Sequence, residues 1–222
     1  YKQGKRIDSY NERIKGKIIP RSKNLSHNYI DLTPYYNAAI DEQWPLLNRN
    51  KGPLSRIPTG LADLENSKFD IRGVVQLSGR QHKNQLGANN PFPSKIDNIN
   101  VGNKRFNSFD FLHAVTWQDP DGTPVANYVL NYSDGTKHAF PVVYGEHVRD
   151  WFVNSDVGIL DTPSSNIAWR NSIIILYQTN FKNPFPEKEI RSINLESQNS
   201  YSNIFIIGIT GNSDSVGTES DK

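Results

Sequence analysis

Cysteine and methionine are both absent from this chain of 222 residues. Without cysteine, the protein has no disulfide bond, no thiol nucleophile and no cysteine-bound zinc. The redox compartment of the protein is left open by this absence. Because the chain also begins at Tyr1, we expect it to be a mature fragment or a domain of a larger multidomain protein.

Long apolar runs are absent as well. No window approaches the ~18 consecutive apolar residues of a membrane-spanning helix, and the first residues lack the apolar core of a signal peptide. The formal net charge is +2, and lysine and arginine are scattered except near the start of the chain. We therefore expect no membrane span and no nucleic acid partner, and we interpret residues 1–28 as a linker or extended arm.

The sequence motifs of several enzyme classes are also missing. There is no GxGxxG, GxxxxGK[ST], HExxH, GxSxG or CxxC pattern, so dinucleotide, nucleotide, metalloprotease and serine-hydrolase functions lose their usual support. The five histidines are isolated in sequence. His113 and His138 fall within predicted strands, which favours structural roles over metal binding.

The chain does contain a series of strand patterns separated by turns. Residues 69–78 alternate apolar and polar side chains, as in a strand with one buried face. Further strand patterns are found at 95–101, 109–117, 168–179, 190–197 and 203–210.

About eight strands with Pro- and Gly-rich turns predict one all-β domain at residues 29–211, a β-sandwich or jelly roll. One or two short helical turns are expected between Ile30 and Trp44, because Pro34 suits the first turn of a helix. The composition of residues 212–222 is typical of a disordered tail.

A β-hairpin is the clearest local signal. An Asp-Gly pair at 134–135 lies between two runs rich in Val, Tyr and Phe, and glycine accepts the positive φ of a tight turn. If this pair forms the two-residue loop, Tyr128 shares a face with Ala139, and Val129 shares the other face with Phe140.

Directly after the hairpin, residues 144–151 combine charged and aromatic side chains. Arg149 is able to take a bidentate carboxylate. The group formed by Glu146, Arg149 and Asp150 is therefore expected to be an ion-pair network that fixes a corner of the fold. The alternative is that these residues orient the hydroxyl groups of a sugar.

Trp151 and Trp169 border the polar loop that lies between them in the sequence. A flat aromatic ring at a loop mouth suits a pyranose, since the C–H face of the sugar is apolar while its hydroxyl groups seek Asp, Asn and Arg. In such a site Arg149, Asp150 or Asp161 would bond the hydroxyl groups. Each tryptophan is equally expected as an anchor of the core.

Carboxylates cluster in the middle third of the chain, and two of them at a suitable separation would serve a glycosidase. Asp119 and Asp121 have the spacing that opens a calcium loop, but no acidic residue follows where such a loop closes. The sequence Asp-Pro-Asp-Gly is also an ordinary turn. We expect no cofactor, with a structural calcium ion at Asp119 and Asp121 as the alternative.

Several segments together resemble a known domain family. The segments are IDLTPYYNAAIDEQW, IPTGL with KFDIRGVVQLSG, FLHAVTW, NYVLNYSDGTKHAFPVVYGEHVRDWF and LYQTNFKNPFPEKEIRSINLES. In this order they cover roughly residues 29–210 and resemble an accessory module of planctomycete and verrucomicrobial multidomain proteins. The resemblance implies a galactose-binding-domain-like β-sandwich, similar to many carbohydrate-binding modules.

The resemblance also marks residues at the recurrent motif positions of that family. These are Asp70, Arg72, Gly73, His113, Tyr144, Gly145, Arg149, Asp150 and Trp151. Arg72 and Tyr144 thereby join the candidate ligand-binding residues. Phe152 departs from the pattern, where a second tryptophan is usual, so a platform of paired tryptophans is not expected.

The leading hypothesis is a non-catalytic module that binds a polysaccharide, including acidic or sulfated ones, on an extracellular, surface or periplasmic bacterial protein. One rival hypothesis is a structural or protein-interaction domain of a larger surface or regulatory protein. The other is a glycan-cleaving enzyme that uses two of the clustered carboxylates.

Overall fold

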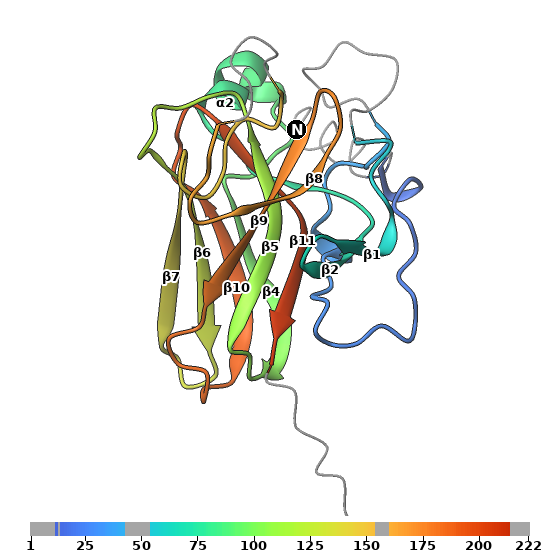
Figure 1. Ribbon diagram of the computed structural model, residues 1–222, viewed down its shortest axis with the longest axis vertical. Coiled ribbons are helices and arrows are strands. Elements are labelled where there is room, and N and C mark those ends of the chain that lie inside the picture. Colours follow the sequence, from blue (N-terminus) through green and yellow to red (C-terminus); the bar gives the residue numbers. More distant parts are fainter. Residues whose placement is uncertain (1–11, 13, 43–53, 154–159, 214–222) are drawn as a thin grey trace, which may run out of the picture.

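The computed structural model describes residues 12, 14–42, 54–153 and 160–213, and all structural statements refer to this part of the chain. Two antiparallel sheets face each other, and a two-stranded hairpin lies beside them (Figure 1). The predicted all-β sandwich is confirmed. Expectations that fell on Trp44, residues 1–11 and residues 214–222 lie outside the described residues.

The first sheet has four strands in the order β4-β10-β6-β7. Its strands are β4 (Lys95–Lys104), β6 (Pro124–Tyr132), β7 (Lys137–Val143) and β10 (Ile190–Ser197). The second sheet has five strands in the order β3-β11-β5-β9-β8. Its strands are β3 (Val75–Gln76), β5 (Ser108–Thr116), β8 (Asn166–Arg170), β9 (Ile175–Lys182) and β11 (Asn203–Asn212). The separate hairpin consists of β1 (Gly60–Leu64) and β2 (Ser67–Ile71).

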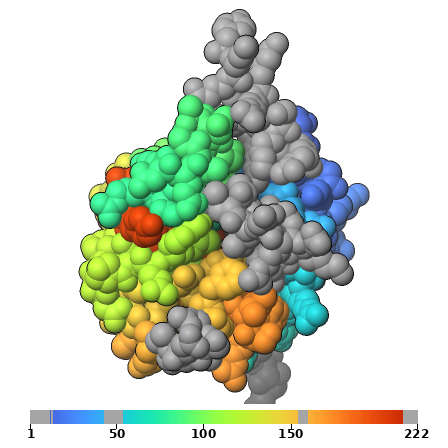
Figure 2. All heavy atoms as spheres, turned by 90° about the horizontal axis from the view of Figure 1, so that it is seen from above, coloured from blue at the N-terminus to red at the C-terminus, as the bar shows by residue number. Residues whose placement is uncertain are grey.

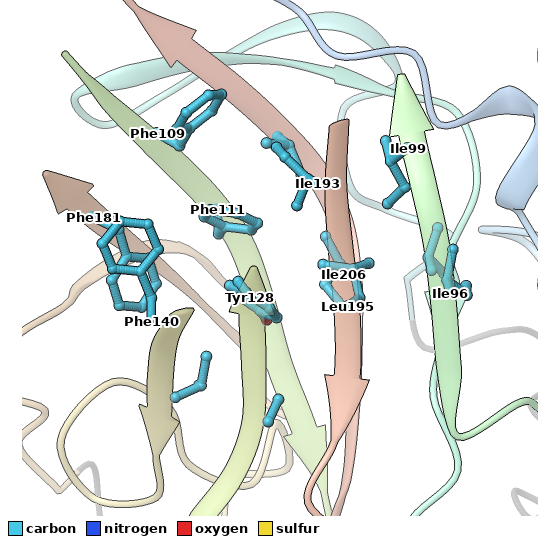
Figure 3. Packing of buried hydrophobic residues seen from close by; sticks show 14 of the residues in the cluster. Ile96, Ile99, Phe109, Phe111, Tyr128, Phe140, Phe181, Ile193, Leu195 and Ile206 are labelled. Carbon is cyan, nitrogen blue, oxygen red and sulfur yellow. The ribbon is translucent and has the colours of Figure 1, made fainter. Parts of the chain in front are cut away.

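The main core lies between the two sheets, where aromatic side chains from both sheets meet (Figure 3). Phe111 of β5 stacks on Tyr128 of β6, with ring centroids 4.3 Å apart. Phe140 of β7 stacks on Phe181 of β9, with centroids 5.1 Å apart. All four rings are buried, and the apolar area that they remove from water stabilises the sandwich.

His113 is part of this core. Its Nδ1 lies 2.8 Å from the hydroxyl of Tyr128, and its Nε2 lies 2.7 Å from the hydroxyl of Thr179. Burial lowers the pKa of His113 to about 3, so the ring is neutral in the folded protein. The predicted structural role of this histidine is confirmed.

A second apolar cluster covers the opposite face of the five-stranded sheet. Leu112 belongs to it, whereas its neighbour Phe111 points into the main core, as the alternation of a strand requires. Phe69 of β2 packs on this face over Gly208, where a Cβ atom would lie 3.0 Å from the Phe69 ring. The β1–β2 hairpin therefore closes the outer cluster.

The helical segments are short. The 3-10 turn η1 (Thr33–Tyr35), with Pro34 in its first turn, confirms the helical turn predicted in this region. The helix α2 (Arg80–Leu86) and the 3-10 turn η2 (Gly87–Asn89) lie between the strand patterns at 69–78 and 95–101. None of the described helices is both long and apolar enough to cross a bilayer.

The β6–β7 hairpin is present, but the predicted pairing is wrong by one residue. Tyr128 is opposite Phe140, and Val129 is opposite Ala139. The loop is longer than Asp134-Gly135 alone, because the N–H of Tyr132 donates to the carbonyl of Thr136 at 2.9 Å. The carboxylate of Asp134 also accepts the N–H of Thr136 at 2.9 Å, and the longer loop shifts the register.

Two predicted strands are each interrupted in the structure. The run 168–179 is a hairpin of β8 and β9, because the side-chain oxygen of Asn171 accepts the N–H groups of Ile173 at 2.8 Å and Ile174 at 2.9 Å. The run 69–78 breaks between β2 and β3 at Gly73. A Cβ atom there would lie 2.6 Å from the Tyr36 ring, so only a glycine leaves room for this close neighbour.

Residues 14–27 form an arm, as predicted, but the arm is packed against the domain. Ile14 is 1% exposed, and Ile18 packs against the main core. In Figure 1 this part of the chain, in blue, runs along the side of the sandwich that carries β1 and β2. The packed structure therefore begins before the predicted boundary at residue 28.

Candidate binding site

Arg149 joins three segments at one end of the sandwich. Its Nη1 and Nη2 donate to the carboxylate of Asp121 at 2.8 and 2.9 Å, and its Nε donates to the carbonyl of Asp161 at 2.8 Å. Figure 2 shows this end from above, with the turn around residue 120 (yellow-green) next to the segment around residue 150 (gold). Arg149 thus fixes a corner of the fold, with Asp121 as its bidentate carboxylate. The predicted ion-pair network of Glu146, Arg149 and Asp150 is wrong, because among the described residues Arg149 pairs with neither carboxylate, and Glu146 instead accepts a hydrogen bond from the hydroxyl of Ser164.

The remaining polar residues of the predicted site also face protein groups. Asp150 accepts the N–H of Phe152 at 3.1 Å, and its own N–H lies 3.5 Å from the hydroxyl of Tyr144. Burial raises the pKa of Asp150 to about 6, whereas the hydrogen bonds from Arg149 lower the pKa of Asp121. Tyr144 is itself buried, and the guanidinium of Arg149 lies 5.7 Å from the centre of its ring.

The two predicted tryptophans differ in exposure. Trp151 is 1% exposed and meets Phe205 edge to face, with centroids 5.2 Å apart. The prediction that Trp151 stacks on a sugar is therefore wrong, because both ring faces are covered by the outer cluster. Trp169, in β8, is half-buried against the same cluster.

Asp119 and Asp121 do not act together. The carboxylate of Asp119 accepts the N–H groups of Tyr201 at 3.2 Å and Ser202 at 2.8 Å, whereas Asp121 binds Arg149. The N–H of Thr123 donates to the carbonyl of Pro120 at 3.1 Å, which is the bond of an ordinary turn. Within the described ranges, no group of three or more His, Cys, Asp or Glu side chains is arranged to hold a metal ion.

Arg72 binds none of the residues that bind Arg149. Its Nε lies 3.0 and 2.9 Å from the two carboxylate oxygens of Asp70, and its Nη2 donates to Asp31 at 2.8 Å. Arg21 of the arm donates to the same Asp70 at 2.7 Å. We call these four residues, Arg21, Asp31, Asp70 and Arg72, the arm cluster. The structure therefore separates Arg72 from the group around Arg149.

A pocket of about 620 Å³ opens beside the arm cluster. One wall consists of arm residues between Ile14 and Pro20, together with Glu12, and the opposite wall is formed by residues 33–37. Pro91, Pro93 and Ile96 complete the lining. We call this cavity the arm pocket.

Tyrosines and polar groups give the arm pocket its chemical character. The hydroxyl of half-buried Tyr35 donates to the carbonyl of Asn98 at 2.7 Å, which fixes the ring. Asn37 is tied to β3, because its side chain and the backbone of Gln76 exchange hydrogen bonds of 2.9 and 2.8 Å. Tyr36 is buried under the guanidinium of Arg72, 5.5 Å from the ring centre, and its hydroxyl has no hydrogen-bond partner among the described residues.

The sequence did not predict this pocket, because a linker or extended arm at residues 1–28 is not expected to form part of the packed domain. One signal was available, since Ile14 and Ile18 are four residues apart and would share a face in a helical turn. The backbone bonds from Lys17 to Ile14 and from Ile18 to Lys15 form such a turn. The opposite wall, from Thr33 to Asn37, has no sequence feature that places it next to the arm.

The chain matches no family model, and no curated protein is similar to it.

Proposed function

We propose that the protein is a non-catalytic carbohydrate-binding module and that the glycan lies in the arm pocket. The observation that carries the proposal is a pocket of about 620 Å³ whose wall includes Tyr35 and Tyr36 beside proline and isoleucine side chains. Ligand sites in proteins have volumes of about 300–1,000 Å³ and combine apolar walls with a few polar groups.

The lining suits the two sides of a sugar. Tyrosine, proline and isoleucine surfaces favour the apolar C–H face of a pyranose. Thr33, Asn37, Glu12 and Lys15 provide polar atoms in the same lining. The hydroxyl of Tyr36 is itself buried, so the ring of half-buried Tyr35 is the aromatic surface that this wall offers to a sugar.

The same lining favours binding over cleavage. A glycosidase uses two carboxyl groups about 5–10 Å apart, and Glu12 is the only carboxylate among the described residues that line the pocket. The module is proposed to belong to an exported or surface multidomain protein of bacteria, as the family resemblance implies.

Affinity electrophoresis tests the proposal directly. Wild type would be run in gels that contain a neutral glucan (laminarin), a uronic glycan (alginate) or a sulfated galactan (carrageenan). Retardation is expected in at least one gel, and Tyr35→Ala should abolish it, because the ring in the pocket wall is lost. Tyr201→Ala is the matched control, since Tyr201 is 39% exposed and does not line the pocket.

Three other outcomes would contradict the proposal. Retardation lost in Trp169→Ala and kept in Tyr35→Ala would place the glycan beside β8. No retardation in any gel, with the variants folded, would favour the protein-interaction hypothesis. Release of new reducing ends from any of the three polysaccharides would favour the enzyme hypothesis.

A further inference from the structure

One wall of the arm pocket belongs to a segment with few backbone ties to the sandwich. Among the described residues, the backbone-to-backbone hydrogen bonds of residues 14–27 are made within the arm or to the nearby Tyr29. The first backbone bonds to β11 come later, from Gly211 to the carbonyl of Asn28 and from Ile30 to the carbonyl of Ile209. The arm is therefore held by side chains, and Asn28 marks the point where the chain is fixed.

Apolar side chains provide part of this attachment. Ile14 is 1% exposed, and Ile18 packs beside Gly73, where a Cβ atom would lie 2.8 Å from the Ile18 side chain. Both isoleucines also line the arm pocket. The pocket wall and the contact between arm and domain are thus made by the same two side chains.

Charged groups provide the remaining attachment of the arm to the domain. Arg21 donates to Asp70 at 2.7 Å and to the carbonyl of Tyr29 at 2.6 Å. Arg72 donates to the carbonyl of Ile19 at 3.3 Å, and Lys17 pairs with Glu42 at a longer 3.8 Å. Because Arg21 makes the two shortest of these contacts, it is the main polar latch of the arm.

The arm cluster is built so that Arg21 is removable. When Arg21 leaves, the carboxylate of Asp70 still accepts from Nε of Arg72, and Arg72 still pairs with Asp31 at 2.8 Å. Breaking a buried ion pair is unfavourable when it leaves a buried charge without a partner. Loss of Arg21 leaves no such charge. Local opening of the arm is therefore compatible with an intact sandwich.

We infer that the arm is a gate on the arm pocket: docking of residues 14–27, latched by Arg21 on Asp70, builds the pocket wall and is coupled to glycan binding. The inference rests on the proposed function for the identity of the ligand. By linkage, a glycan that contacts the docked arm stabilises docking, and a weaker latch lowers the affinity for the glycan.

Limited trypsin digestion tests the gate, because Lys15, Lys17 and Lys23 place cleavage sites in the arm. Arg21→Gln is expected to raise the rate of arm cleavage about tenfold, as the loss of two charge-assisted hydrogen bonds implies. Lys23→Gln is the matched control, because it removes one charge and one cleavage site from an exposed position of the same arm. The sandwich should remain resistant to trypsin in both variants.

A second set of digestions is done in the presence of laminarin, alginate or carrageenan. A polysaccharide that retards wild type should slow arm cleavage, and its retardation of Arg21→Gln should be weaker than that of Lys23→Gln. Equal arm cleavage in the two variants, or arm cleavage only at the rate at which the whole domain is digested, would overturn the gate. If none of the three polysaccharides binds wild type, the proposed function is refuted. The comparison of Arg21→Gln with Lys23→Gln then still decides whether the arm opens without unfolding of the sandwich.

Discussion

Two arginine clusters of similar composition lie in very different surroundings. In the arm cluster, the side chains of Arg72 and Asp70 are 1% and 3% exposed. Around Arg149 the arginine side chain is 13% exposed, and its partner Asp121 is 67% exposed. Both arginines join segments that are distant in sequence, so the difference between them is the access of water to the carboxylate.

That difference determines what each cluster contributes. An exposed ion pair adds little free energy, because water replaces either partner. A buried pair is required once it exists, because loss of one partner leaves the other charge without compensation. The Arg149 group is therefore a clamp on loops, whereas the arm cluster determines whether β2, η1 and the arm pack in one arrangement.

Replacing each arginine by methionine should give the largest contrast. Arg72→Met leaves buried Asp70 with only Arg21 and leaves Asp31 without its 2.8 Å partner. The free energy of unfolding should fall, but by less than the roughly 3–5 kcal/mol of a buried charge left with no partner, because Arg21 still pairs with Asp70. Arg149→Met should cause a much smaller loss, because Asp121 remains solvated. Urea denaturation of both variants measures the two changes.

A control separates charge from packing in this comparison. Arg72→Met combined with Asp70→Asn removes both buried charges and should recover part of the stability that Arg72→Met loses. Equal losses for Arg72→Met and Arg149→Met would contradict the distinction between the two clusters.

The second prediction concerns Asp150, a half-buried acid that lies next to Arg149 in sequence but forms no ion pair among the described residues. Burial raises its pKa from 3.8 to about 6, so the folded protein binds a proton more tightly than the unfolded chain. The stability contributed by protonated Asp150 is present below about pH 4 and is lost as the pH rises through about 6. The shift corresponds to about 3 kcal/mol.

Asp150→Asn should therefore be more stable than wild type by up to about 3 kcal/mol at pH 8 and about equal to it at pH 4. The amide oxygen of asparagine is still able to accept the N–H of Phe152. Thermal unfolding from pH 4 to 8 gives the comparison, with Asp161→Asn, an exposed acid of the same region, as the control. A constant difference between Asp150→Asn and wild type across this pH range would contradict the assignment.

The strands were predictable where alternation continues through a whole element. The predicted run 190–197 coincides with β10, where Ile193 and Leu195 alternate with polar neighbours and both reach the main core. The prediction was wrong where a side chain ends a strand inside an apolar run. Asn171 turns the chain by accepting two backbone N–H groups, and no hydrophobic pattern records that bond.

The arrangement around Arg149 was predictable in part. Its bidentate carboxylate was expected, but the identity of Asp121 was not, since the two residues are 28 positions apart. The arm pocket could not be predicted, because its walls come from the arm, η1 and the approach to β4. Local patterns record the burial of each segment and carry no information on which distant segments meet.

The smallest predicted effect tests the space around the Arg149 clamp. Gly145 has φ +84°, and a Cβ atom there would lie 2.6 Å from Cγ of Asp121. Gly135 has φ +89°, and a Cβ atom built on it would have no other atom within 4 Å. Gly135→Ala should therefore lose only the roughly 1–2 kcal/mol of a left-handed backbone conformation. Gly145→Ala should lose this and more, because Asp121 must move away from Arg149.

Urea denaturation of the two glycine variants measures the difference, which is the contribution of crowding at Asp121. The difference should shrink when Gly145→Ala is combined with Asp121→Ala, because the atom that the new methyl group meets is then removed. If the difference is unchanged in the double variant, contacts of the new methyl group other than Asp121 are responsible. The clamp would then be more tolerant of displacement than its bidentate geometry implies.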